Sequence, residues 1–389
     1  MGDSMHNPAG TGSTWRNANQ WLSVADMNTL EIPKPRLNKF AGIARKAVRV
    51  SETDLVKATP LVEGTLLPLV IQPVVHGVSL ISWAGNNRDF IETNLLKHGG
   101  ILFRKFTLQS PGEFEQFIAA VSGEVLEYRE RSSPRVQVSG NIYTSTEHPA
   151  DQSIFLHNEN SYQAIFPLKI FFRCVTVAAK GGETPIADCR RIYKRIDPKI
   201  RERFAEKKWM YMRNFNNGFG LPWQTVFQTE DKSEVEFYCR SKGITVEWKD
   251  GDRLRTRAVR PAITCHPHTG EPVWFNHATF FNVSTLEASL RDALLAEFSE
   301  EDLPTNTYYG DGSPIESEVL EQLREIYRQE TVSFPWQEHD ILMLDNLMSA
   351  HARSPYEGAR KVLVGMAEPF HRNADGVAEA WKGNAETEY

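Results

Sequence analysis

The spacing of hydrophobic positions in this chain changes near residue 135. Before that point, apolar side chains recur every three to four residues in two segments, 88–98 and 110–123, which is typical of helices with one buried face. Gly99 follows the first segment, as expected at the end of a helix. Ser110 and Glu113 have the spacing of a capping box at the start of the second. This part of the chain is therefore predicted to form two helices with a strand between them.

After residue 135, short runs of aromatic and β-branched residues alternate with turn residues, which indicates strands. Four segments with helical spacing interrupt them. Many short strands with helices outside are typical of a β-sandwich or a jelly roll. The predicted strands are 136–143, 153–157, 168–178, 260–267, 272–276, 331–336, 340–346 and 360–369, and the predicted helices are 188–207, 233–243, 285–298 and 314–330.

These patterns fit one large domain. Residues 1–55 are rich in Gly, Ser, Asn and Pro, then in isolated basic residues, and show no helical or strand period. We expect them to form a loosely ordered N-terminal arm. Residues 56–375 are expected to form a single jelly-roll domain with helical insertions, and residues 376–389 a C-terminal tail.

Composition narrows the class of protein. The 389 residues are 41% hydrophobic and carry a formal charge of −6, which gives no reason to expect nucleic acid or an anionic membrane as a partner. The four cysteines lack CxxC spacing, so a reducing, cytoplasmic setting is expected. No secretory signal is expected at the N-terminus, and no apolar run approaches the ~18 residues that span a bilayer.

A polar group interrupts the apolar pattern at residues 157–160. His157 and Glu159 are two residues apart at the end of a predicted strand, where alternate side chains point the same way. His351 lies 194 residues later, after another predicted strand. Two histidines and one carboxylate form a set that holds Fe(II) and leaves positions open for a 2-oxo acid and O2. On these residues alone, a structural role for the histidines is the competing interpretation.

A 2-oxoglutarate cosubstrate would need a cation for its distal carboxylate. Arginine suits this purpose because its guanidinium binds a carboxylate through two parallel hydrogen bonds. Arg360 follows His351 by nine residues, and Thr184 follows the Gly181-Gly182 turn, so the two are candidates for this contact.

Four motifs, taken in order, resemble the taurine dioxygenase and clavaminate synthase-like superfamily of Fe(II)/2-oxoglutarate-dependent oxygenases, particularly its SyrP-like branch from antibiotic biosynthesis. They are LHNENSY, KGGETPIADCRRIY, VWFNHATFF and LDNLMSAHARSPYEGARKVLV. The resemblance covers roughly residues 75–370. It implies a mainly β fold with flanking helices, a distorted double-stranded β-helix or jelly roll, and a dioxygenase that uses Fe(II), 2-oxoglutarate and O2.

The resemblance also implies roles for individual residues. The implied iron ligands are His157, Glu159 and His351, and the implied contacts to the distal carboxylate of 2-oxoglutarate are Arg360 and Thr184. The interval between His351 and Arg360 is shorter than in some members of the superfamily. Arg353 is therefore a second candidate for a carboxylate contact, either to cosubstrate or to substrate.

Other residues near these motifs are candidates for the pocket. Asn160 and Tyr162 either touch substrate or only satisfy the turn that contains them, and one of Asn276 and His277 is expected to line the pocket. Asp345 and Asn346 are expected to fix the turn before His351, or to orient a metal ligand by a hydrogen bond to that ligand. The histidine-rich stretch 265–277 could be a second metal site, but its Pro and Gly residues favour a hairpin.

The predicted reaction is hydroxylation of an unactivated C–H bond. Related halogenases leave the carboxylate position vacant for chloride, whereas Glu159 fills it here, and desaturation by the same enzyme class is the alternative. The branch resemblance implies an amino-acid-like substrate, free or presented on a carrier protein, with no prediction of oligomeric state. A zinc hydrolase and a non-catalytic small-molecule sensor are the interpretations from other classes.

Overall fold

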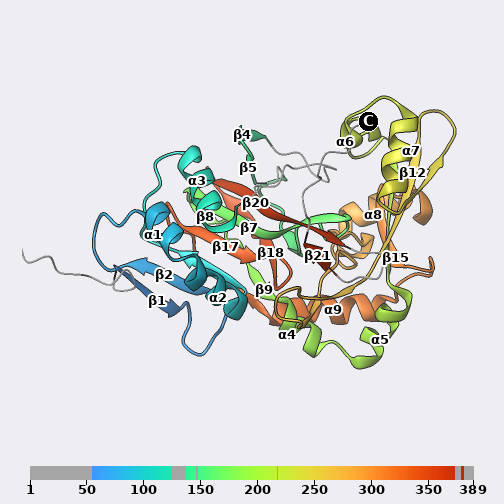
Figure 1. The fold of residues 1–389 in the computed structure, drawn as a ribbon. Helices are drawn as coiled ribbons and strands as arrows, with labels where there is room; N and C mark the ends of the chain where they lie inside the picture. Colours follow the sequence, from blue (N-terminus) through green and yellow to red (C-terminus); the bar gives the residue numbers. More distant parts are fainter. Residues whose placement is uncertain (1–54, 124–135, 146–147, 217, 373–377, 381–389) are drawn as a thin grey trace, which may run out of the picture. The chain divides into compact units, whose positions relative to one another are not determined.

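The computed structural model describes residues 55–123, 136–145, 148–216, 218–372 and 378–380 (Figure 1). All of them belong to one compact unit, Val50–Tyr389. The predicted N-terminal arm and most of the predicted C-terminal tail lie outside the described residues.

A nine-stranded sheet is the largest element of the fold. All of its neighbouring pairs are antiparallel except β2 and β3, and a last strand, β21 (Ala378–Ala380), pairs with β20. In spatial order the other strands are β1 (Val56–Pro60), β2 (Leu69–Pro73), β3 (Gly100–Phe103), β17 (Ile341–Asp345), β7 (Ile165–Thr176), β20 (Lys361–Arg372), β5 (Ile142–Thr144) and β4 (Gln137–Ser139).

A second sheet of four strands packs against one face of the large sheet. Its spatial order is β16 (Thr331–Val332), β9 (Ile186–Asp188), β18 (Ser349–Arg353) and β6 (Ile154–His157). Along the chain, β6, β9 and β18 of this sheet alternate with β7, β17 and β20 of the large sheet. This alternation between two sheets makes a double-stranded β-helix, so the predicted jelly roll with flanking helices is confirmed.

Both faces of the large sheet are buried, which explains why β7 is a continuous apolar run rather than an alternating one. Ile170 and Phe172 point toward the second sheet and share a cluster with Ile186. Phe171, between them, points to the opposite face and packs against Phe117 of a covering helix. The helices on that face are α1 (Leu80–Asn86), α2 (Arg88–His98) and α3 (Pro111–Ser122).

A third sheet lies in the insertion between β9 and β17. Its strands are, in order, β11 (Ile244–Trp248), β12 (Leu254–Arg260), β10 (Trp209–Phe215) and β15 (Thr305–Tyr309). Two-stranded ribbons are formed by β13 (Ile263–Cys265) with β14 (Pro272–Trp274) and by β8 (Lys180–Gly181) with β19 (Tyr356–Glu357). The remaining helices are α4 (Cys189–Arg195), α5 (Pro198–Lys207), α6 (Trp223–Phe227), α7 (Lys232–Ser241), η2 (Val283–Thr285), α8 (Ala288–Glu297), η3 (Glu300–Asp302) and α9 (Ser317–Gln329).

Local signals in the sequence were mostly correct at helix ends. Gly99 ends α2 in the left-handed conformation, with φ 75°. The Ser110 hydroxyl accepts a hydrogen bond from the Glu113 backbone N–H at 3.1 Å, as the capping box predicts. The Glu113 carboxylate, however, accepts from the backbone N–H of Gln109 instead of that of Ser110.

Three element predictions were wrong. The single strand predicted at 136–143 is two short strands, β4 and β5, which pair with each other because the chain turns at Gly140. The helix predicted at 188–207 is two helices, because Asp197 caps a new helix and Pro198 cannot continue the old one. The strand predicted at 331–336 is only the two-residue strand β16. In addition, the third sheet was not predicted, although the helices at 233–243 and 285–298 beside it were. Among the described residues, none of the helices is both long and apolar enough to cross a membrane.

Candidate metal centre and adjoining pockets

The second sheet brings together the two histidines and the glutamate singled out by the sequence. His351 on β18 lies directly opposite His157 on β6, and their ring centroids are 4.4 Å apart. Glu159 lies two residues beyond the end of β6, and its Oε2 is 3.7 Å from Nε2 of His351. One ligand atom from each of the three residues lies within 4.8 Å of the others, and within the described part of the chain this is the one such cluster.

The ring of His157 is held from two sides. Its Nδ1 is 2.8 Å from the carbonyl oxygen of Phe155, so Nδ1–H donates there and Nε2 keeps its lone pair. The ring of Phe280 stacks on it at 4.5 Å between centroids, with 24° between the planes. A fixed tautomer and a fixed ring plane are what a metal-binding histidine needs.

The backbone of Glu159 is fixed by Asn346, which is fully buried. The side-chain oxygen of Asn346 accepts from the Glu159 N–H at 2.7 Å, and its amide nitrogen donates to the carbonyl oxygens of Glu159 at 2.9 Å and Pro167 at 2.8 Å. Asn158 in turn donates to the Asn346 carbonyl at 2.7 Å. The loop that follows β17 and the exit from β6 are thereby locked to each other.

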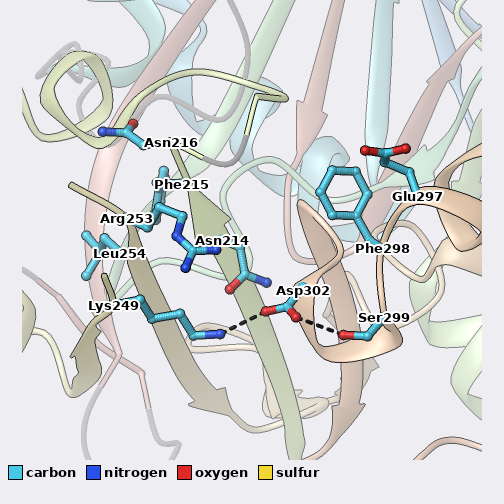
Figure 2. Close-up of a pocket in the computed structure, with 10 residues that line it drawn as sticks. All are labelled: Asn214, Phe215, Asn216, Lys249, Arg253, Leu254, Glu297, Phe298, Ser299 and Asp302. Carbon is cyan, nitrogen blue, oxygen red and sulfur yellow. Dashed lines mark hydrogen bonds and ion pairs between the residues drawn. The ribbon is translucent and has the colours of Figure 1, made fainter. Parts of the chain in front are cut away.

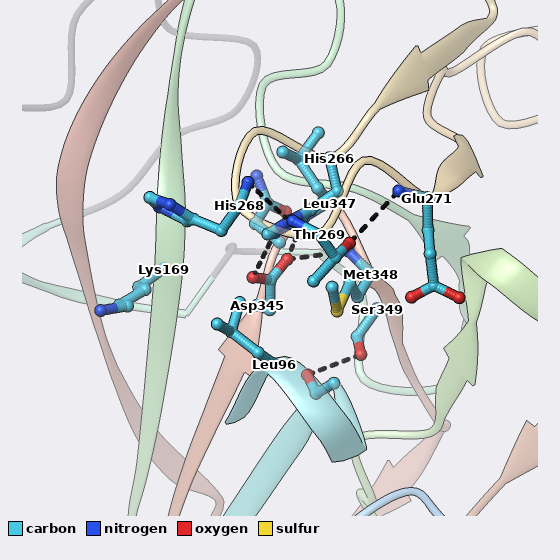
Figure 3. A network of polar contacts seen from close by, with 12 residues as sticks. Leu96, Lys169, His266, His268, Thr269, Glu271, Asp345, Leu347, Met348 and Ser349 are labelled. Carbon is cyan, nitrogen blue, oxygen red and sulfur yellow. Dashed lines mark hydrogen bonds and ion pairs between the residues drawn. The ribbon is translucent and has the colours of Figure 1, made fainter. Parts of the chain in front are cut away.

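Asp345 stabilises the turn that leads to His351. One of its oxygens accepts from the backbone N–H groups of Leu347, at 3.0 Å, and Met348, at 2.9 Å. Its other oxygen accepts from Nε2 of His266 at 2.9 Å (Figure 3). Nδ1 of His266 accepts from the backbone N–H groups of His268 and Thr269, which fixes the tautomer that donates to Asp345.

The histidine-rich stretch is therefore a hairpin, as its Pro and Gly residues predicted. It contains β13 and β14, and it sends His266 inward to the turn before β18. This contact was not predicted, because 79 residues separate His266 from Asp345 and neither spacing nor composition links them.

A small pocket adjoins the histidine pair on one side. Arg360 and Thr184 both line it, together with His157 and His351. Nε of Arg360 donates to the Gly182 carbonyl at 2.8 Å, and its terminal nitrogens reach the hydroxyls of Ser145, at 3.4 Å, and Thr184, at 3.5 Å. In the described part of the chain, none of these partners carries a charge.

Burial, and after it the positive charge of Arg353, lowers the pKa of Arg360 to about 10, so the side chain remains a cation at neutral pH. The Thr184 hydroxyl accepts a second hydrogen bond, from Nε1 of Trp336 at 3.2 Å. Neither Ser145 nor Trp336 was predicted, and the interval of 152 residues between Trp336 and Thr184 gives no signal in the sequence.

Arg353 also lines the small pocket, but its terminal nitrogens point to the backbone. They donate to the carbonyls of His148 at 2.8 Å, Pro149 at 2.5 Å and Gln152 at 2.7 Å. Arg353 therefore clamps the segment before β6, and the terminal nitrogens of Arg360 make the longer hydrogen bonds of the two arginines.

A larger pocket adjoins the other side of the cluster. Asn160, Tyr162 and His277 line it together with His157 and Glu159. Asn276 does not line it, because its side chain is used within its own turn, donating to Ala262 O at 3.0 Å and accepting from Ala278 N at 2.9 Å. Burial, followed by the neighbouring charge of His157, lowers the pKa of His277 well below its usual value.

Comparisons with known proteins agree with this architecture. The family described as "Taurine catabolism dioxygenase TauD, TfdA family" matches residues 63–367. The dapdiamide synthesis protein DdaC of Enterobacter agglomerans is 38% identical over 316 residues, which cover 78% of this chain and 96% of that protein. A clavaminate synthase-like protein of Arabidopsis thaliana is 29% identical over 293 residues, covering 72% and 85% of the two chains.

Among solved structures, the PvcB protein of Pseudomonas aeruginosa superimposes with a TM-score of 0.48 at 15% identity, covering 80% of this chain and 90% of that one. The family match and the dapdiamide relative each extend over more than two thirds of the chain. The chain therefore belongs to the TauD/TfdA dioxygenase family, and it is an enzyme that depends on Fe(II), 2-oxoglutarate and O2.

Proposed function

We propose that His157, Glu159 and His351 hold Fe(II), and that the enzyme hydroxylates an unactivated C–H bond of an amino acid or a carrier-tethered aminoacyl group. The donor set supports the metal: two imidazoles and one carboxylate, all buried or half-buried, converge within 4.8 Å. This set leaves coordination positions open on Fe(II), where 2-oxoglutarate and O2 supply the oxidising chemistry.

Arg360 and Thr184 would hold the distal carboxylate of 2-oxoglutarate. The guanidinium is largely buried, and its hydrogen-bond partners in the described residues are neutral oxygens. A buried cation without a counter-charge is costly, and a carboxylate accepting two N–H bonds would remove that cost. The Thr184 hydroxyl already accepts from Arg360 and Trp336, so its own hydrogen is available to the ligand.

The observation that carries the proposal is the position of the cluster between two pockets. His157 lines both, the small one that contains Arg360 and the large one that contains Asn160 and Tyr162. A cosubstrate in the small pocket and a substrate in the large one would approach the same metal from two sides. A dioxygenase that couples decarboxylation of one molecule to oxidation of another requires this arrangement.

Two further observations refine the reaction. Glu159 occupies the carboxylate position of the cluster, which supports hydroxylation over halogenation. The relative named for dapdiamide synthesis supports a biosynthetic role for this chain. Membership of a dioxygenase family removes the support for the zinc-hydrolase and sensor interpretations.

An anaerobic titration with Fe(II) and 2-oxoglutarate tests the metal assignment. Wild-type protein is expected to develop the weak visible metal-to-ligand band of a chelated 2-oxo acid, and His157→Ala is expected to lack it while keeping the same far-UV circular dichroism. With substrate and ¹⁸O2, product should gain one labelled oxygen for each succinate formed. A product lighter by two hydrogens would instead show desaturation, and an unchanged band in His157→Ala would refute the ligand assignment.

A further inference from the structure

The larger pocket has a distinct charge pattern among its described lining residues. Beyond the metal cluster, it contains two exposed carboxylates, Asp151 and Glu287, and neither lysine nor arginine. Of its other two histidines, His148 has its pKa lowered by burial, and His277 is buried with its Nδ1 hydrogen-bonded to the Ser161 hydroxyl. Among the described lining residues, a free carboxylate of the substrate would meet neither lysine nor arginine, and leaving a carboxylate unpaired in this pocket would be costly.

The two arginines near the cluster do not change this pattern. Arg353 and Arg360 line only the small pocket, and the terminal nitrogens of Arg353 donate to three backbone carbonyls. If Arg360 holds the cosubstrate, no described arginine is left for a carboxylate of the substrate.

One polar side chain next to the cluster lacks a partner. Asn160 directly follows Glu159 and is 3% exposed, and its side-chain oxygen has no hydrogen-bond partner in the described structure. Its backbone φ is 55°, a left-handed conformation that Asn tolerates better than most residues. A buried acceptor that lines a pocket and stays unsatisfied costs free energy unless a ligand supplies the donor.

The rest of the lining is suited to a carbon chain. The rings of Phe280 and Phe281 lie near the cluster, with centroids 4.9 Å apart. The lining reaches the surface at Leu286 and Leu290, which are 37% and 42% exposed. An apolar passage thus connects the metal cluster to solvent, with the two carboxylates at its edge.

We propose that the substrate carries its carboxyl group masked, as a thioester, ester or amide, and donates a hydrogen bond from an N–H or O–H group to the side-chain oxygen of Asn160. This inference rests on the proposed function, and it favours a carrier-tethered aminoacyl group or another masked form over the free amino acid. The masked carboxyl group of the substrate points toward the surface, along Leu286 and Leu290. Its N–H or O–H group lies beside Glu159, where the side-chain oxygen of Asn160 accepts the hydrogen bond.

The first test uses the visible band of the anaerobic Fe(II)–2-oxoglutarate complex, whose appearance depends on the proposed function alone. The common L-amino acids are added as free acids, as primary amides and as N-acetylcysteamine thioesters. At least one masked member should perturb the band with about 10-fold higher affinity than its free acid, the scale of one unfavourable polar contact. Equal or tighter binding of the free acid, or no binding by any masked member, would overturn the inference.

The second test separates the Asn160 side chain from its backbone conformation. Asn160→Gly tolerates the left-handed backbone but removes the acceptor, whereas Asn160→Asp keeps an acceptor oxygen in the same place. The masked probe should bind about 10-fold more weakly to the Gly variant and within a few-fold of wild type to the Asp variant. The band without probe should persist in both. Unchanged probe affinity in the Gly variant, or loss of the band itself, would refute the role given to Asn160.

Discussion

Two pockets of this protein are lined by charged side chains, and one cation in each, Lys249 and Arg360, shows a difference in hydrogen-bond partners. The charged residues that line the pocket beside the third sheet include Lys249, Arg253 and Asp302 (Figure 2). There Lys249 is bonded to Asp302 at 2.8 Å, and Asp302 also accepts from Ser299 at 2.8 Å. In the pocket beside the metal cluster, Arg360 has only neutral partners among the described residues.

The difference shows that a polar lining is a weak sign of function by itself. Asn214, on the wall of the first pocket, donates to the carbonyls of Glu301 and Leu303 and accepts from Arg255, so it too is satisfied within the protein. Groups that satisfy each other gain little from a ligand. A buried charge whose hydrogen-bond partners are all neutral, like that of Arg360, gains most from a ligand of opposite charge.

The largest effect is expected from substituting one of the three proposed iron ligands. Glu159→Ala should lower 2-oxoglutarate-dependent succinate formation by more than about 100-fold, because losing a ligand should exceed the 10–100-fold cost of losing an outer-shell partner. The measurement is succinate release at saturating Fe(II) and 2-oxoglutarate. Activity within 10-fold of wild type, in a variant with an unchanged melting temperature, would contradict Glu159 as a ligand.

The next effect tests the unpaired cation. Arg360→Met should weaken 2-oxoglutarate binding by about 100-fold, since charge-assisted hydrogen bonds are worth roughly 1.5–3 kcal/mol. Arg360→Lys keeps the charge but lacks the planar guanidinium, so its affinity for 2-oxoglutarate should lie between those of wild type and Arg360→Met. Without ligand, Arg360→Met should melt no lower than wild type, because burial penalises the charge it removes. A drop in melting temperature with unchanged 2-oxoglutarate affinity would give Arg360 a structural role instead.

A smaller effect is expected from substituting Asn346, which holds the backbone of the proposed ligand Glu159 in place. Asn346→Ala removes three hydrogen bonds that fix the backbone around Glu159 and should reduce Fe(II) affinity by about 10-fold. Asn346→Asp keeps the acceptor for the Glu159 N–H and loses both donors, so it should separate the two contributions. Fe(II) titration of both variants gives the answer, and wild-type affinity in the Ala variant would show that the loop holds its shape without Asn346.

The smallest effect is expected from breaking the Lys249–Asp302 ion pair in the pocket beside the third sheet. Lys249→Met should leave 2-oxoglutarate binding unchanged and cost less than about 1 kcal/mol of stability, as partly exposed ion pairs do. The Lys249 hydrogen bond is the main reason that the pKa of Asp302 lies below its usual value of 3.8. The stability that the pair contributes is therefore present above pH 3.8 and is lost as the pH falls through the lower pKa of the folded state. Thermal melts at pH 7 and in more acidic buffers measure both expectations.

The sequence predicted those parts of the molecule that follow local rules. The spacing of His157 and Glu159 along one strand exit anticipates that both point to one place, and the apolar runs of β7 and β17 predict buried strands. The third sheet was missed because β12 carries three arginines in seven residues, a pattern that suggests an exposed segment. In the structure, Arg255 and Arg260 of this strand are buried, with their donors on backbone carbonyls, Asn214 and Asp302.

The residues that hold the candidate site in place were also missed by the sequence analysis. His266 and Trp336 act through single contacts, to Asp345 and Thr184, that join distant parts of the chain. No period or motif encodes such a contact, because it depends on how two elements pack after both have folded. The ligand candidates are therefore readable from the sequence, and the residues that hold them in place are not.

The stacking of Phe280 on His157 sets a constraint on engineering this enzyme for new substrates. Phe280 is an attractive residue to shrink, since it lines the larger pocket, but its ring also holds the imidazole that both pockets share. Its neighbour Phe281 stacks on Tyr211 and His277 instead. Libraries that diversify position 281 should therefore leave the proposed iron site intact in most members, whereas selection at position 280 trades substrate range against the integrity of that proposed site.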